Sequence, residues 1–267
     1  MKFIVPVLVF LCTCCSVRAE DVPLFAAASN MMQVMTEILY QYQHEHGAGE
    51  INMVFGSSGN FARQIIQGAP FELFLSANKK YVDVLIQDNK HVSAFQEFAQ
   101  GRIGYFIPAG SLLSGKKNLK EINQSLINGE YRRIAIANPD FAPYGAAARQ
   151  SLQTAGLWAI KKEKLLSGEN IAQAMQYTLA GGVDIGIVPQ SFAVLAEIRE
   201  QGDFFLIPQD WHEPIIEYLV LLRHATPESR AFYQYLLSGK AKPILEKYGY
   251  RAGTTPDNLN LSQKITK

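Results

Sequence analysis

Four short turns in the chain carry the residues best suited to chemistry, and each joins an apolar run to a helical pattern. They contain small, hydroxyl-bearing or glycine residues: AAASN at 26–30, FGSSGN at 55–60, NPDFAPYG at 138–145 and SGEN at 167–170, just before Ile171. Ligands bind at the carboxyl ends of the strands in open parallel α/β sheets. The first amides of a helix have no partner within the helix and carry a partial positive charge. The turns together therefore predict an anion site made of serine hydroxyls and backbone amides.

Each turn also has a purely structural interpretation. Four of the polar residues are of types that cap helix N-termini for local reasons: Ser29, Asn30, Ser57 and Ser58. Tyr144 follows a proline, and tyrosine often packs in a core. The side chain of Ile171 is expected in the core, so only its backbone N–H could reach a ligand. The functional interpretation depends on the turns occurring in series, and no single turn establishes it.

The sequence does not match the known catalytic, metal-binding and nucleotide-binding patterns. FGSSGN is not a G-x-S-x-G motif, because Asn60 stands where the last glycine should be. His44 and His46 are two residues apart, so they point to different helix faces and form a poor metal pair. A GxxxxGK[ST] loop is absent. A secreted serine hydrolase with Ser58 as nucleophile stays as an alternative, although the sequence offers no partner base for it.

The composition is that of an ordinary globular protein. The 267 residues are 48% hydrophobic and 18% charged, with a formal net charge of +1. Nucleic-acid-binding proteins normally have a basic stripe, and none is visible in this sequence. We therefore expect no nucleic-acid partner.

The first nineteen residues predict a secretory signal peptide. Lys2 gives a small positive region, Ile4 to Leu11 forms a short apolar core, and the segment ends in a small residue at Ala19. The apolar run is much shorter than the roughly 20 residues of a membrane span. All three cysteines lie in this segment: Cys12, Cys14 and Cys15. A lipid anchor at Cys14 or Cys15 is an alternative, and the mature chain has no disulfide and no cysteine-based metal site.

Apolar runs alternate with helical patterns along the rest of the chain, which predicts an α/β protein with parallel sheets. The expected strands are 22–28, 51–56, 71–77, 102–108, 132–139, 183–190, 204–208 and 213–223. The expected helices are 29–47, 57–68, 79–87, 143–158, 170–182, 191–202 and one or two within 227–250. No later segment is long and apolar enough to enter a membrane, and the polar residues 254–267 are expected to form a loose tail.

Four strings resemble the periplasmic molybdate-binding proteins of ABC importers, in order, from about Leu24 to Tyr250. They are LFAAASNMM, FGSSGNFARQIIQGAPFELFLSAN, RIAIANPDFAPYGAAARQSLQTAGLW and GIVPQSFA. The resemblance implies the α/β fold of a type II periplasmic binding protein, with two lobes, a hinge and an inter-lobe cleft. Residues 20–102 and 214–267 would form one lobe and 103–213 the other. The residues alone would support one or two α/β domains.

The resemblance also implies which residues hold the ligand: Ser29, Asn30, Ser58, Tyr144 and the amide of Ile171. They would contact oxygens of the anion, so Ser29, Ser58, Tyr144 and Ile171 would not be direct metal ligands. Pro189 departs from the family, in which many members have a tyrosine whose hydroxyl touches the ligand. We expect the Tyr144 hydroxyl to supply that missing donor.

The function that the resemblance implies is capture of molybdate or tungstate in the periplasm for the membrane permease subunits of an ABC importer. We expect a monomer without enzymatic activity and without a cofactor, whose only metal arrives inside the transported oxyanion. A sulfate- or phosphate-type oxyanion carrier is the alternative within the binding class. Neutral donors are sufficient in principle, because hydrogen bonds to a charged group contribute about 1.5–3 kcal/mol each.

Overall fold

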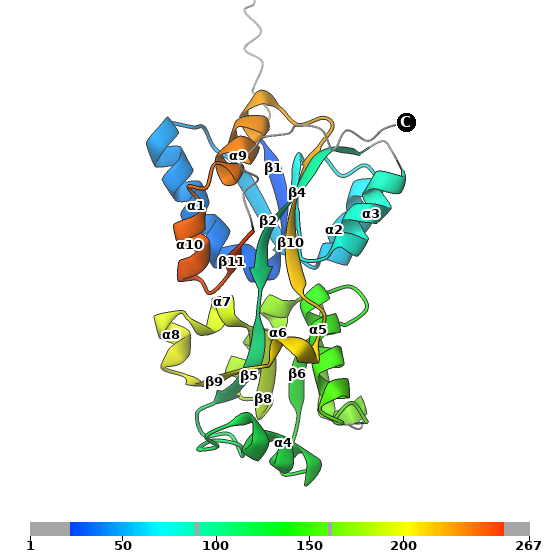
Figure 1. The fold of residues 1–267 in the computed structure, drawn as a ribbon, viewed down its shortest axis with the longest axis vertical. Coiled ribbons are helices and arrows are strands. Elements are labelled where there is room, and N and C mark those ends of the chain that lie inside the picture. The colour runs from blue at the N-terminus through cyan, green and yellow to red at the C-terminus, as the bar shows by residue number, and fades with distance from the viewer. Residues whose placement is uncertain (1–21, 89–90, 160–161, 254–267) are drawn as a thin grey trace, which may run out of the picture.

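The computed structural model describes residues 22–88, 91–159 and 162–253, which form two α/β lobes arranged along the long axis of the molecule (Figure 1). The expected signal peptide, with its cysteines, and the expected tail lie outside the described residues. Within the described ranges, no helix combines the length and the hydropathy of a membrane span.

Lobe 1 contains a six-stranded sheet in the order β11-β4-β10-β3-β1-β2. Its strands are β1 (Leu24–Ala28), β2 (Asn52–Gly56), β3 (Leu73–Ser76), β4 (Val92–Gly101), β10 (Ile215–Leu222) and β11 (Arg251–Ala252). β1 pairs in parallel with β2 and β3, whereas β10 and β4 are antiparallel to their neighbours. The carboxyl ends of β1, β2 and β3 therefore meet at one edge of the sheet.

Lobe 2 contains a five-stranded sheet in the order β7-β6-β8-β5-β9. Its strands are β5 (Ile103–Pro108), β6 (Ile134–Ala137), β7 (Leu165–Gly168), β8 (Ile185–Pro189) and β9 (Gly202–Leu206). β6 is parallel to β7 and β8, and β5 is antiparallel to β8 and β9. The expectation of parallel sheets was incomplete, because both sheets are mixed.

Helices cover the sheets and bury apolar side chains against them. Those of lobe 1 are η1 (Ser29–Met31), α1 (Met32–His46), α2 (Ser58–Ile66), α3 (Lys79–Gln87), α9 (Pro227–Leu237) and α10 (Lys242–Lys247). Those of lobe 2 are α4 (Leu119–Ile127), α5 (Pro143–Thr154), η2 (Lys162–Lys164), α6 (Ile171–Leu179), α7 (Gln190–Ala193), α8 (Ala196–Arg199) and η3 (Gln209–Trp211). In lobe 1, α1, α9 and α10 lie on one side of the sheet and α2 and α3 on the other (Figure 1).

Two antiparallel strands connect the lobes. β4 leads through Arg102 into β5, and β10 returns beside β4 after η3, with Ile215 opposite Gly101. Ile215 belongs to the apolar core of lobe 2, whereas Leu219 and Leu221 on the same strand belong to a core of lobe 1. One strand thus anchors in both cores, and we propose to place the lobe boundaries at this crossing, as the resemblance implied.

Several elements differ from the sequence-based expectations. β4 and α4 were not predicted. The helix expected over 191–202 is two short helices, because Leu195 has an extended backbone with ψ 136°. The segment 227–250 is also two helices, and Gly239 between them takes a φ of 84°, a conformation that glycine adopts without strain.

Candidate functional site

A small pocket, called the cavity below, lies where the two lobes meet. Its volume is ≈ 10 Å³, close to the roughly 10–15 Å³ that one enclosed water needs. The wall is formed by Ala28, Ser29, Asn30, Gly56, Ser57, Ser58, Ala142, Pro143, Tyr144 and Ile171. All five residues that the resemblance selected lie in this wall, together with Ser57, which was not selected. None of the wall residues carries a charged side chain.

The cavity is surrounded by helix N-termini whose first amides are available. α2 begins after Ser57 and α5 begins after Ala142, and neither N-cap residue makes a side-chain capping bond. α6 is capped by Asn170, whose side chain accepts from the amide of Gln173 and leaves the Ile171 amide free of that bond. Unpaired first-turn amides together with the helix dipole favour an anion. Both lobes therefore direct partial positive charge at the same space.

Two serine hydroxyls are held so that they can donate. The Ser29 hydroxyl oxygen accepts from the Ala172 amide of lobe 2 at 3.3 Å. The Ser58 hydroxyl oxygen accepts from the Ala77 amide at 3.1 Å. A serine hydroxyl has one hydrogen to donate besides its acceptor lone pairs. Since each oxygen already accepts, each O–H remains available for a group that only accepts hydrogen bonds.

Direct contacts between the lobes close the cleft. The Gly59 amide of lobe 1 donates to the Phe141 carbonyl of lobe 2 at 3.0 Å. At the rim, the Asn60 side-chain amide donates to the Glu169 carboxylate at 3.0 Å. A cation–π contact places the Arg63 guanidinium 5.3 Å from the centre of the Phe141 ring. Opening the cleft would break these contacts, so the structure represents the closed form.

A buried polar network lies beside the cavity and is centred on Glu217 of β10. The Asn30 side-chain amide donates to the Glu217 carboxyl at 2.7 Å and to the Tyr250 hydroxyl at 2.8 Å. The Tyr144 hydroxyl donates to the same Glu217 oxygen at 3.1 Å. The Tyr250 and Ser191 hydroxyls both donate to the backbone carbonyl of Asn30, at 2.8 and 3.0 Å. The network joins η1, the hinge strand and two helices of lobe 2.

The Tyr144 hydroxyl, which the resemblance assigned to the ligand, has hydrogen-bond partners within the protein. The Tyr144 hydroxyl donates a hydrogen bond to Glu217 and accepts one from the Asn30 side-chain amide. It lies so close to the hinge residue Gly101 that a Cβ atom on residue 101 would collide with the hydroxyl oxygen. The backbone amide of Tyr144, in contrast, belongs to the first turn of α5. Pro189 is not among the residues of the cavity wall.

Burial determines the charge states in this network. Burial raises the pKa of Glu217 to about 8, although hydrogen bonds from Asn30 and Tyr144 oppose the increase. Burial, together with Tyr250 and the Glu217 carboxyl, raises the pKa of Tyr144 well above its ordinary value. The second carboxyl oxygen of Glu217 is buried and has no hydrogen-bond partner within the part of the chain that the structure describes. The hydroxyl of Tyr144 is therefore a neutral donor next to a carboxyl that is held largely in its neutral form at pH 7.

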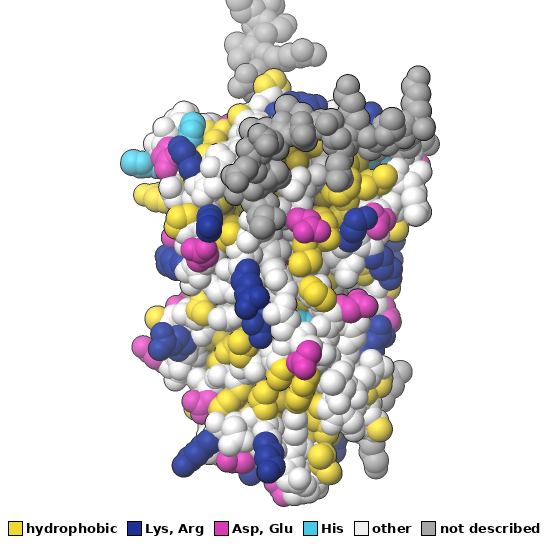
Figure 2. Space-filling view, viewed as in Figure 1, with side chains coloured by type: hydrophobic (Ala, Val, Ile, Leu, Met, Phe, Trp, Pro, Cys, Tyr) yellow, Lys and Arg dark blue, Asp and Glu magenta, His cyan; other side chains and the backbone are white. Residues whose placement is uncertain are grey.

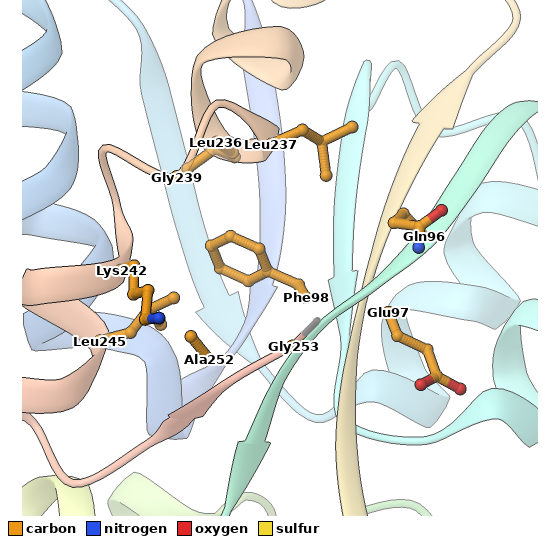
Figure 3. A pocket seen from close by; sticks show the side chains of 10 residues that line it. All are labelled: Gln96, Glu97, Phe98, Leu236, Leu237, Gly239, Lys242, Leu245, Ala252 and Gly253. Atoms are coloured by element: carbon orange, nitrogen blue, oxygen red, sulfur yellow. The ribbon is translucent and has the colours of Figure 1, made fainter. Parts of the chain in front are cut away.

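Other parts of the described molecule are weaker candidates for a site. One pocket of ≈ 30 Å³ has a largely apolar wall, in which Phe98 of β4 and Leu245 of α10 take part (Figure 3). Lysines and arginines are interspersed with acidic side chains on the face seen in Figure 2, with no basic stripe. No group of three or more His, Cys, Asp or Glu side chains within the described residues could hold a metal ion. No histidine lines the cavity next to Ser58, so the described wall offers a serine nucleophile no base.

Comparisons with known proteins agree with this geometry. Residues 24–251 match the sequence profile of the family described as "Bacterial extracellular solute-binding protein". The chain is 33% identical over 246 residues to the molybdate-binding protein ModA of Azotobacter vinelandii, covering 88% of this chain and 92% of the relative. It is 31% identical to ModA of Escherichia coli, covering 86% and 88%. The solved periplasmic molybdate-binding protein of Azotobacter vinelandii superposes with a TM-score of 0.77 at 25% identity, covering 86% of this chain and 98% of that one.

Proposed function

Because the chain belongs to the bacterial extracellular solute-binding proteins, and among them to the molybdate-binding ModA proteins, we propose that it captures molybdate for an ABC importer. The proteins of this family bind solutes and are not enzymes. The observation that supports the proposal most directly is the inter-lobe cavity, in which serine hydroxyls of lobe 1 and helix N-termini of both lobes converge without any charged side chain.

The proposed ligand donors are neutral and come from both lobes. From lobe 1 they are the Ser29 hydroxyl and the hydroxyl and amide of Ser58. From lobe 2 they are the amides of Tyr144 and Ile171. We propose that Asn30 acts by orienting Tyr144 and the hinge network, and that the Tyr144 hydroxyl serves Glu217 and not the ligand.

These donors are sufficient for tight binding. A hydrogen bond to a charged group contributes about 1.5–3 kcal/mol, and nanomolar to micromolar affinity requires about 8–12 kcal/mol net. The gain must also exceed the cost of ordering both partners. Preorganised amides and hydroxyls reduce that cost, so no counter-cation is needed.

The same donor set favours a fully deprotonated oxyanion. Every proposed group donates a hydrogen, and no wall residue has a carboxylate that could accept the proton of a protonated anion. Molybdate and tungstate are dianions that only accept hydrogen bonds at neutral pH. Discrimination against the smaller sulfate would then depend on how the two lobes fit around the bound anion.

We further propose that the protein acts as a monomer in the periplasm after removal of the signal peptide near Ala19, a segment outside the described residues. Molybdate or tungstate is its transported ligand and no cofactor is required. Closure of the two lobes about the β4–β10 hinge would create the surface that the importer's permease subunits recognise.

Thermal unfolding with different oxyanions tests the proposal. Dialysed protein is heated with molybdate, tungstate, sulfate or phosphate at equal ionic strength. A ligand at about 1,000 times its Kd adds about 4 kcal/mol, which corresponds to a rise in melting temperature of roughly 8–16 °C for a chain of this size. Molybdate and tungstate are expected to produce this rise. A larger response to sulfate or phosphate would make the chain a carrier of that anion, and no response to any of them would refute oxyanion binding.

A further inference from the structure

Ser57 stands at the N-cap of α2, yet it does not act as a cap. A serine at this position normally accepts a hydrogen bond from the second or third amide of its helix. Here no side-chain capping bond is made. The second amide, that of Gly59, donates instead to the Phe141 carbonyl of lobe 2 at 3.0 Å. The Gly59 amide therefore has an acceptor in lobe 2 and does not use the Ser57 hydroxyl.

The Ser57 hydroxyl has no hydrogen-bond partner among the described residues. Ser57 is only 4% exposed, and its oxygen is buried without a hydrogen bond. Buried hydroxyls in proteins almost always have a partner, and one that lacks it needs an explanation. Ser57 lies in the wall of the inter-lobe cavity. The two other serines of that wall already have a partner for their oxygens, namely Ala172 for Ser29 and Ala77 for Ser58.

We propose that the Ser57 hydroxyl donates a hydrogen bond to the bound oxyanion and does so only in the closed form, so that Ser57 links lobe closure to affinity. The inference rests on the proposed oxyanion-binding function and adds a binding residue to it. With the lobes apart, the Gly59 amide has no Phe141 carbonyl and is available to the Ser57 oxygen. On closure, Phe141 takes that amide and Ser57 turns its hydroxyl to the anion.

Two substitutions separate ligand binding from capping. Glycine is a good N-cap residue without a side chain, whereas alanine is a poor one. Ser57→Gly therefore removes the hydroxyl and keeps a favourable N-cap residue, whereas Ser57→Ala removes the hydroxyl and leaves an unfavourable one. Asn118→Ala is the matched control, because the Asn118 side chain caps α4 of lobe 2 through the Glu121 amide at 3.0 Å.

The experiment is a titration of each purified full-length variant with sodium molybdate by calorimetry, together with its melting temperature without ligand. Both Ser57 variants are expected to raise the Kd roughly ten- to hundredfold, as for one lost hydrogen bond to a charged acceptor. Asn118→Ala is expected to lower the melting temperature and leave the Kd unchanged.

The outcomes distinguish this inference from the function on which it rests. A Ser57→Gly protein that binds molybdate as tightly as the wild type would overturn the role of Ser57, even where Ser58→Ala abolishes binding. Wild-type protein that binds no oxyanion would overturn both proposals. A loss of affinity in Ser57→Ala but not in Ser57→Gly would assign Ser57 to capping and also overturn the inference.

Discussion

Replacement of Glu217 by glutamine is expected to change the pH dependence of folding. Glu217 is fully buried, and its pKa is raised from an ordinary value of 4.5 to about 8. Because the raised pKa belongs to the folded state, folding favours the protonated carboxyl. The wild type therefore carries no penalty from this group below pH 4.5, loses stability as the pH rises from 4.5 to 8, and loses no more above pH 8.

The size of the effect follows from the same values. A difference of about 3.5 on the pH scale corresponds to roughly 5 kcal/mol, at about 1.4 kcal/mol for each unit. Glutamine cannot ionise, and its carbonyl oxygen can still accept from Asn30 and Tyr144. We expect the free energy of unfolding of Glu217→Gln relative to wild type to increase by several kcal/mol, up to about 5 kcal/mol, between pH 4.5 and pH 8.5.

The assay is urea unfolding of ligand-free protein at a series of pH values, with the difference between variant and wild type taken at each pH. Glu37→Gln is a control whose pH effect has the opposite sign and lies below pH 4.5, so its difference from wild type should stay nearly constant from pH 4.5 to 8.5. Burial raises the pKa of Glu37, but hydrogen bonds from Lys247 and Tyr248 together outweigh burial. The net pKa of Glu37 is therefore below its ordinary value. The stability that Glu37 contributes is therefore complete above its ordinary pKa and is lost as the pH falls below it. A difference between Glu217→Gln and wild type that stays constant from pH 4.5 to 8.5 would refute the assignment of a neutral buried carboxyl.

Three further substitutions test the site. Ser58→Ala should raise the Kd for molybdate at least tenfold, measured by calorimetry, and should also cost about 1–3 kcal/mol in urea unfolding because the Ala77 amide loses its partner; an unchanged Kd would exclude this hydroxyl from the ligand. Tyr144→Phe should lower the free energy of unfolding by about 1–3 kcal/mol, since the Glu217 carboxyl loses a donor, and should change the Kd much less than Ser58→Ala does. A loss of affinity as large as that of Ser58→Ala would place the phenol on the ligand. Asn60→Ala removes an exposed rim contact to Glu169 and should weaken binding by no more than about fivefold, equal to the ~1 kcal/mol of such contacts; a larger change in fluorescence- or calorimetry-based titrations would mean that the rim controls closure.

Local sequence patterns were sufficient for the strands and helices that are strongly apolar on one face. β1, α1, β3, α2 and β8 were expected close to their observed bounds, because their apolar residues recur at the periods of a strand or a helix. β4 was missed because glutamine, glutamate and serine interrupt its apolar residues, and only its pairing with β10 and β11 makes it a strand. α4 was missed because it follows a long polar stretch, and its Asn118 cap was not used as a start signal.

The composition of the cavity wall was also visible in the sequence. Serine, asparagine and glycine at the junctions between strands and helices indicated anion chemistry, and the strings around them indicated the family. These features are local, because a helix start and its free amides depend on a few consecutive residues.

The direction of each polar side chain was decided by the tertiary structure alone. Tyr144 turns its hydroxyl to Glu217, which lies 73 residues further along the chain, and Ser57 loses its capping role to a carbonyl at Phe141. Glu217 has a raised pKa because distant elements enclose it and exclude water. A one-dimensional pattern specifies which groups are present, whereas hydrogen-bond partners and burial arise only when remote segments are packed together.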